Sequence, residues 1–233
     1  YLTLVGLAAL IVGGVGVANA VGAFMELKRP VIATLRSLGA AGGLVTRLYL
    51  IQILLIALLG VVIGLAIGAL VPVVALQFLA DVLPVGAETG FYPTALGYAA
   101  LYGLLTALTF ALVPLGRAGD IAPTALFRDG AAFGKMRPRL AFLIAAIVSA
   151  AVLAGLAILL AYDRRIAFYF VIGVAASFLL LRLVAWAVTA LARRAPRLAS
   201  TEWRLAVGNI HRPGALTGSV VLSLGLGLTV LVT

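Results

Sequence analysis

Six long runs of apolar residues, separated by short polar or basic stretches, dominate the chain. They cover residues 2–25, 45–76, 95–113, 140–161, 166–191 and 214–233. A helix needs about 20 apolar residues to cross the hydrocarbon core of a bilayer. The pattern therefore predicts an all-α, polytopic helical membrane protein. The second run is longer than one straight crossing requires, and Pro72 is expected to kink or end its helix.

The composition agrees with a membrane location. Hydrophobic residues make up 64 % of the chain, charged residues make up 10 %, and the mean hydropathy is +1.24. A soluble domain of this length cannot bury so large an apolar fraction, so membrane lipids are the expected surroundings. The net charge of +10 comes from basic residues between the spans, without an interleaved aromatic stripe, so nucleic acid is not an expected partner.

The basic residues fall almost entirely on one side of the predicted membrane. Those on this side are Lys28, Arg29, Arg36, Arg47, Arg117, Arg128, Lys135, Arg137, Arg139, Arg193, Arg194, Arg197, Arg204 and Arg212. The other side carries only Arg164 and Arg165, beside Asp163, with which they are expected to form a local ion pair. Because Lys and Arg accumulate on the cytoplasmic side, Tyr1 is predicted to be extracytoplasmic.

A short charged stretch, ELKRPVIATLRSLG, separates the first two runs at residues 26–39. Pro30 suits the first turn of a helix, and Gly39 suits a left-handed cap. Four apolar residues share one face at helical spacing, namely Leu27, Val31, Leu35 and Leu38. The stretch therefore predicts a separate amphipathic helix over residues 27–39. Such a helix can lie in the lipid headgroup layer or dock into a partner, and the residues alone leave both uses open.

Small residues recur four apart in the first two runs. Because small faces let helices approach closely in lipid, these positions are expected to pack helices together. With the polar Asn19, which is expected to bond to another helix, the predicted helix-packing residues are Gly14, Gly16, Ala18, Asn19, Gly60, Gly64 and Gly68.

The chain offers little catalytic chemistry. It has no cysteine, and His211 is its only histidine, so no metal site is expected. The spans hold neither a nucleophile–base pair nor an acidic proton relay, which argues against an intramembrane enzyme and against an ion-driven transporter. Arg182 lies inside the fifth run, where snorkelling, a structural pairing and a functional role all remain open. Because the chain starts without Met and stops within an apolar run, we expect a piece of a longer protein.

Four motifs follow one another over the first 130 residues. They are VGGVGVANA at 12–20, LRSLGA at 35–40, IQILLIALLGVVIGLAIG at 51–68 and ALVPLGRAGDIAPTALFRDG at 111–130. Together they resemble the membrane domain of FtsX-like ABC transporter permeases. The resemblance implies a permease domain over residues 1–130, two linking spans over 131–198, and the amphipathic elbow and first span of a second copy over 199–233. This layout is similar to the ten-span, two-copy permeases.

The resemblance also implies a mechanism. The helix at 27–39 would be a coupling helix, and its expected contacts with the ATPase are Glu26, Lys28, Arg29, Val31, Ile32, Leu35, Arg36 and Ser37. Two copies of an ABC ATPase subunit would bind ATP and Mg, and this chain would bind no cofactor and catalyse no reaction. The expected function, in a bacterial inner (plasma) membrane, is export or extraction of hydrophobic or lipid-like molecules at the outer face, with an extracytoplasmic esterase as a possible partner. The alternative is a non-transporting scaffold that activates an extracytoplasmic hydrolase.

Overall fold

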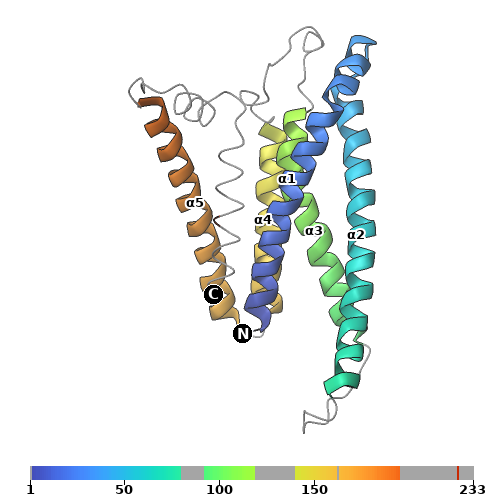
Figure 1. The fold of residues 1–233 in the computed structure, drawn as a ribbon, viewed down its shortest axis with the longest axis vertical. Helices are drawn as coiled ribbons and strands as arrows, with labels where there is room; N and C mark the ends of the chain where they lie inside the picture. The colour runs from blue at the N-terminus through green and yellow to red at the C-terminus, as the bar shows by residue number, and fades with distance from the viewer. Residues whose placement is uncertain (1, 80–91, 119–139, 162, 195–224, 226–233) are drawn as a thin grey trace.

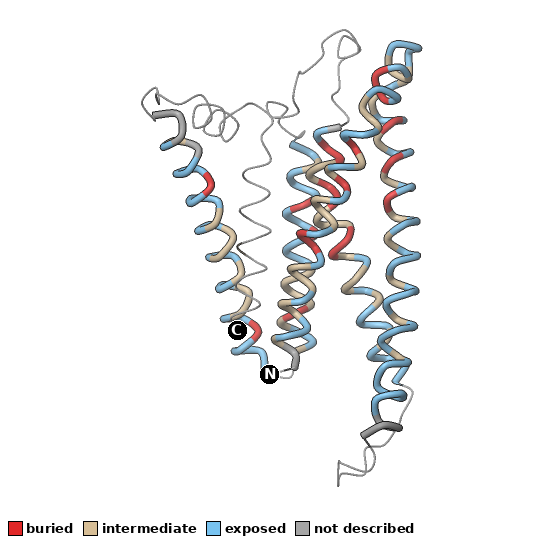
Figure 2. The backbone as a smooth tube through the Cα atoms, in the orientation of Figure 1, coloured by how far each residue is buried: buried red, intermediate tan, exposed pale blue. Residues whose placement is uncertain are grey.

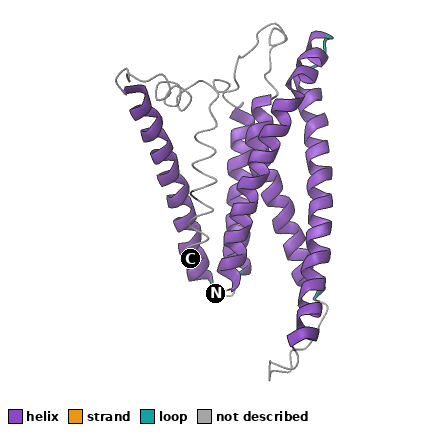
Figure 3. Cartoon of the chain, viewed as in Figure 1, coloured by secondary structure: helices purple, strands orange, loops and turns teal. Residues whose placement is uncertain are grey.

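The computed structural model describes residues 2–79, 92–118, 140–161, 163–194 and 225. Five helices alternate in direction along the bundle (Figure 1), and they are α1 (Leu2–Ser37), α2 (Gly42–Leu79), α3 (Pro93–Ala118), α4 (Leu140–Leu160) and α5 (Arg164–Arg194). All five are long and apolar enough to cross a membrane. Figure 3 shows helix and short loops in the described part of the chain. The prediction of an all-α polytopic membrane fold is confirmed.

Some of the expected elements lie outside the described residues. These are the sixth span at 214–233 apart from Gly225, the rest of the expected second copy, His211, and the segment between α3 and α4.

α3 lies at the centre of the bundle. It packs extensively against α1, α2 and α4, whereas α1 and α2 share few contacts although they are consecutive in the chain. Two glycines of α3 allow close approach of its neighbours. A methyl group at Gly103 would lie 3.0 Å from Cγ2 of Val61 in α2, and one at Gly116 would lie 2.7 Å from Cβ of Phe142 in α4. Small residues on α3 thus let α2 and α4 pack closely against this central helix.

Three helices continue through a proline. Pro30 lies inside α1, Pro72 inside α2 and Pro114 inside α3. The expectation that Pro30 starts a separate helix was therefore wrong, and Pro72 does not end the second span. A proline removes one backbone hydrogen bond of a helix. Where such a proline lies within lipid, a broken helix would leave several backbone groups unpaired, so continuing through the proline is the smaller loss.

Most of the outer surface of the bundle is apolar and exposed, whereas the buried residues gather where the helices meet (Figure 2). Large side chains such as Leu55, Leu59 and Leu70 of α2 are at least 61 % exposed. Exposing so large an apolar surface to water would be strongly unfavourable, whereas lipid tails solvate it. Arg182, in the middle of α5, is a charged side chain that is also exposed.

The predicted helix-packing glycines differ in whether another helix lies against them. Gly14 is buried, and a methyl group there would meet the ring of Phe110 in α3. A methyl group at Gly16, Gly60, Gly64 or Gly68 would meet no neighbouring atom within 4 Å. Among the described residues, the expected packing role of these four glycines is therefore not found. For the three on α2 the reason is that α2 meets α3 through the face that carries Val61.

Candidate functional site

The loop joining α1 and α2 stands beyond the ends of the other helices (Figure 1). We call residues 26–48, which form the end of α1, the turn and the start of α2, the α1–α2 tip. The 36 residues of α1 and the 38 of α2 correspond to lengths of about 54 and 57 Å, against about 39 Å for the 26 residues of α3. Since the hydrocarbon core is about 30 Å thick, α1 and α2 are long enough to cross it and to carry the tip beyond the membrane surface.

A helix cap closes the tip. Gly39 has a φ of 94°, in the left-handed region, as the sequence predicted. The N–H of Ala40 donates to the C=O of Leu35 at 3.0 Å, and the N–H of Gly39 donates to the C=O of Arg36 at 3.1 Å. These two bonds define a Schellman motif, which satisfies the last carbonyls of α1 and reverses the chain within a few residues.

A compact apolar cluster lies beneath the tip and joins three helices. Its buried members are Val21, Met25, Ile32 and Ala33 of α1, Val45, Tyr49 and Ile53 of α2, and Ala111 and Leu115 of α3. Ile32 is fully buried, with an exposure of 0 %. The expectation that Ile32 contacts a partner was therefore wrong, because this side chain fills the space between α1 and its neighbours. Leu35 is half-buried and packs against the same cluster.

An exposed stripe runs along the opposite arc of α1 within the tip. Leu27, Val31 and Leu38 are 79, 49 and 80 % exposed. Thr34 is exposed between them and donates its hydroxyl to the C=O of Pro30 at 3.0 Å. The spacing of 27, 31, 34 and 38 places these residues along one helix face. We call this set the exposed stripe.

The expected polar contact residues surround this stripe. Glu26 and Ser37 are exposed, whereas Lys28, Arg29 and Arg36 are half-buried. Nη1 of Arg29 lies 3.7 Å from Oε1 of Glu26, three residues earlier in the helix, so the two side chains form an ion pair. The hydroxyl of Ser37 donates to the C=O of Thr34 at 2.8 Å. The tip thus presents apolar side chains bordered by charges, a mixture typical of protein interfaces.

An aromatic contact ties α1 to α2 just below the tip. Nζ of Lys28 lies 5.7 Å from the ring centroid of Phe24, and that ring meets Tyr49 of α2 edge-on with centroids 6.1 Å apart. The arrangement is a cation–π contact on an aromatic pair. Sequence reasoning missed this contact and the buried Met25, although Val45, Tyr49 and Ile53 recur every four residues and indicate a buried helix face.

Further from the tip, an apolar groove of about 600 Å³ lies between α1 and α2, with α3 as its floor. Its walls include Val21 and Phe24 of α1, and its floor includes Gly103. Gly60 and Gly64 line the α2 wall, so these two glycines border open space. Ala18 and Asn19 are half-buried in α1. Among the residues that the structure describes, no group of His, Asp or Glu could hold a metal ion.

Comparison with known proteins gives a consistent match. The family described as FtsX-like permease C-terminal matches residues 3–123. The chain is 32 % identical over 130 residues to the macrolide export ATP-binding/permease protein MacB of Escherichia coli K12, and 31 % identical to that of Salmonella paratyphi A. Each alignment covers 55 % of this chain and 19 % of the relative. No solved structure matches the chain.

Proposed function

Because the chain belongs to the FtsX-like permease family, we propose that its α1–α2 tip is the surface on which an ATP-binding component acts. The chain is a multi-pass membrane component of an ABC transporter. The observation that carries the proposal is the exposed stripe, which ends a helix that continues into the membrane without interruption. Large exposed apolar side chains in a charged border are suited to burial against a protein partner.

The continuity of α1 gives the tip a mechanical role. A separate coupling helix would transmit force through a flexible joint, whereas α1 carries the stripe and the span in one helix. The buried cluster ties this helix to α2 and α3. Displacement of the tip by the ATP-binding component would therefore tilt α1 and α2 over α3. Such tilting would widen or close the apolar groove between them.

The substrate class that suits this groove is hydrophobic or lipid-like. The groove is apolar and opens between two helices whose outer faces suit lipid. We propose that the chain helps export or extract such molecules at the outer face of a bacterial inner membrane. ATP and Mg would be bound by two copies of the ATP-binding component and not by the residues of this chain. An extracytoplasmic esterase remains a proposed partner on the resemblance alone.

The distribution of charge supports the orientation. Lys28, Arg29, Arg36 and Arg47 belong to the tip, and Arg117 ends α3 at the same end of the bundle. Positive charge marks the cytoplasmic side of membrane proteins. We therefore propose that the tip is cytoplasmic, where ATP is available, and that the start of α1 is extracytoplasmic.

The test compares two exposed leucines at the same end of the bundle. Leu27 lies in the stripe and is 79 % exposed, whereas Leu140 at the start of α4 is 75 % exposed. The full-length protein and its ATP-binding component would be reconstituted in nanodiscs, and ATP turnover and assembly measured. We expect Leu27→Gln to weaken assembly by tenfold or more, since burying a leucine contributes about 1.5–3 kcal/mol.

Leu140→Gln is the matched control and should leave assembly and turnover unchanged. An unchanged Leu27→Gln protein, or equal loss in both variants, would contradict the proposal that the stripe is the surface on which the ATP-binding component acts. Movement of a fluorescent lipid from the outer leaflet, measured in the same nanodiscs, separates export from the scaffold alternative. ATP turnover that switches on an extracytoplasmic hydrolase without any lipid movement would favour the scaffold.

A further inference from the structure

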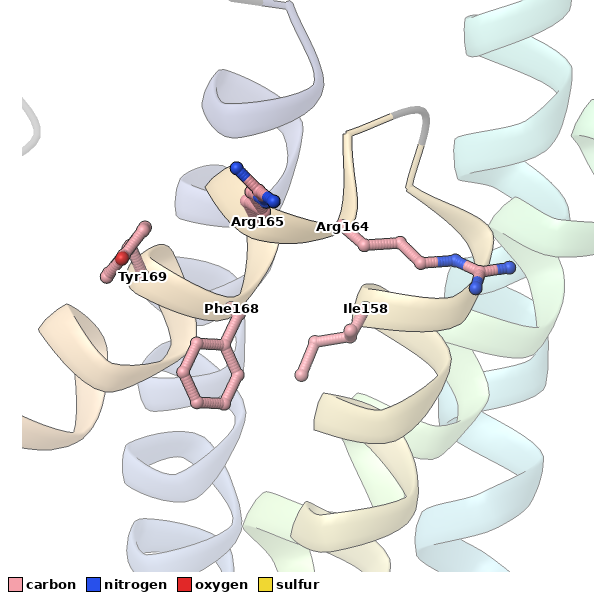
Figure 4. Close-up of a pocket in the computed structure, with 5 residues that line it drawn as sticks. All are labelled: Ile158, Arg164, Arg165, Phe168 and Tyr169. Atoms are coloured by element: carbon pink, nitrogen blue, oxygen red, sulfur yellow. The ribbon is translucent and has the colours of Figure 1, made fainter.

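A second pocket lies at the α4–α5 turn, at the end of the bundle opposite the α1–α2 tip. Its volume is about 390 Å³, and it is lined by Ile158, Arg164, Arg165, Phe168 and Tyr169 (Figure 4). Of the residues that the structure describes at this end, only the two arginines are basic. Lys and Arg are usually scarce on the extracytoplasmic side of a membrane protein. The positive-inside bias therefore does not explain the presence of these two arginines.

The neighbouring carboxylate is engaged with the backbone. Oδ1 of Asp163 accepts hydrogen bonds from the backbone N–H groups of Arg165 at 3.0 Å and Ile166 at 3.3 Å. Asp163 is thus the N-cap of α5. The expected ion pair is not formed: among the described residues, neither arginine lies within 4.0 Å of a carboxylate. Among the described residues, neither guanidinium group is therefore paired with a carboxylate, and the turn of Asp163, Arg164 and Arg165 carries a net positive charge.

The pocket combines these cations with an apolar floor. In Figure 4, Ile158 and Phe168 lie between α4 and α5, while the two arginine side chains extend apart from each other near the turn. Phe168 is 51 % and Tyr169 72 % exposed, and their rings meet edge-on with centroids 6.2 Å apart. Aromatic rings at the end of a span are typical of the membrane interface. A small soluble anion would make no use of this apolar surface.

We propose that this pocket binds the phosphate headgroup of an anionic phospholipid, whose acyl chains lie along α4 and α5. Guanidinium groups are weakly hydrated and match phosphate oxygens with paired N–H donors. The two arginines line the pocket from different sides. Their long, exposed side chains can turn toward a headgroup, where Ile158 and Phe168 would contact the start of an acyl chain. The site is independent of the tip and holds whether or not the tip is the coupling surface.

The test uses a fluorescent reporter at the site in the full-length protein. Tyr169→Trp supplies it, with Trp186, Trp203 and every other tryptophan of the full-length protein replaced by phenylalanine, in vesicles containing brominated phosphatidylglycerol or brominated phosphatidylcholine. Stronger quenching by the anionic lipid is the expected result. In Arg164→Gln/Arg165→Gln the relative affinity for phosphatidylglycerol should fall about thirty-fold, because each basic residue near the membrane surface contributes about a fivefold preference for anionic lipid.

Two variants separate the site from general effects. Arg164→Lys/Arg165→Lys should keep most of the preference, which also excludes misfolding as the cause of a loss. Arg193→Gln/Arg194→Gln, the same charge change at the other end of α5, should leave the quenching at Tyr169→Trp unchanged. Equal quenching by both lipids, or an undiminished preference after Arg164→Gln/Arg165→Gln, would overturn the proposal. Displacement of the brominated lipid by millimolar inorganic phosphate would overturn it too, since the pocket would then bind the free anion.

Discussion

Replacing Gly39 with alanine tests whether the left-handed cap holds the α1–α2 tip in its shape. Gly39 has a φ of 94°, and a methyl group there would meet no neighbouring atom within 4 Å. The substitution therefore changes only the backbone preference. A residue with a Cβ atom is disfavoured in the left-handed region by about 1–2 kcal/mol. The loss of freedom in the unfolded chain offsets up to about 1 kcal/mol of this penalty.

We expect a net loss of about 1 kcal/mol in the free energy that closes the turn. Hydrogen exchange measured by mass spectrometry reports this locally, because the amides of residues 39 and 40 are bonded across the cap. About 1 kcal/mol corresponds to roughly fivefold faster exchange in peptides that cover the turn. Gly39→Asn should show a smaller acceleration, since asparagine tolerates the left-handed region better than alanine does.

Gly43→Ala is the matched control. Gly43 lies in the first turn of α2, and a methyl group there also meets no atom within 4 Å. Its conformation is helical, so alanine should stabilise it by about 0.5–1 kcal/mol and slow exchange. Faster exchange after Gly39→Ala and slower exchange after Gly43→Ala, at two glycines where a methyl group meets no atom, would identify the left-handed cap as the cause. If both substitutions change exchange in the same direction, the reasoning about Gly39 is refuted.

Three other substitutions have effects that the packing dictates, and each is measured by thermal unfolding of the full-length protein in detergent. Gly116→Ala should lower the stability by about 1–3 kcal/mol, since the added methyl group overlaps the base of a phenylalanine side chain on α4. Ile32→Ala should cost about 2–5 kcal/mol by leaving a cavity beneath the tip. Thr106→Val should raise the stability by up to about 1 kcal/mol, because the buried Thr106 hydroxyl has no partner among the described residues.

Each of these has a control on the same helix. Gly97→Ala adds a methyl group to open space in α3 and should not destabilise the protein. Val31→Ala alters an exposed neighbour of Ile32 and should have a small effect. The hydroxyl of Thr109 donates to the C=O of Leu105 at 2.7 Å, so Thr109→Val should not match the gain at Thr106. A substitution that behaves like its control would contradict the packing assigned to that residue.

The helices and their order could be predicted from the sequence because membrane spans are specified locally. An apolar run of sufficient length forms a helix wherever lipid surrounds it, and every backbone group is satisfied within the run. Gly39 was predictable for the same reason, since a cap depends on a few adjacent residues. Continuation through Pro30 was not predicted. It depends on Met25, Ile32 and Ala33, which lie on both sides of the proline and pack into one cluster.

The contact face of the tip was only partly predictable. In the charged stretch, apolar residues lie on more than one arc of the helix, and spacing grouped Leu35 with Leu27, Val31 and Leu38. The family resemblance placed Ile32 among the expected contact residues. The arc that becomes buried is set by α3, whose contacts come from residues far along the chain. The same limit applies to the glycine stripe of α2, because spacing alone does not identify which face meets another helix.

The central position of α3 has a consequence for how the protein is made. α1 and α2 leave the ribosome and enter the membrane before α3, yet they share few contacts with each other. Their common cluster lacks Ala111 and Leu115 until the third span has been synthesised. The α1–α2 hairpin is therefore expected to stay in the bilayer as two inserted but loosely associated helices until α3 arrives and joins them. Biogenesis of this protein is thus expected to have a late assembly step, and a nascent chain stopped before α3 should be the form most exposed to membrane proteases.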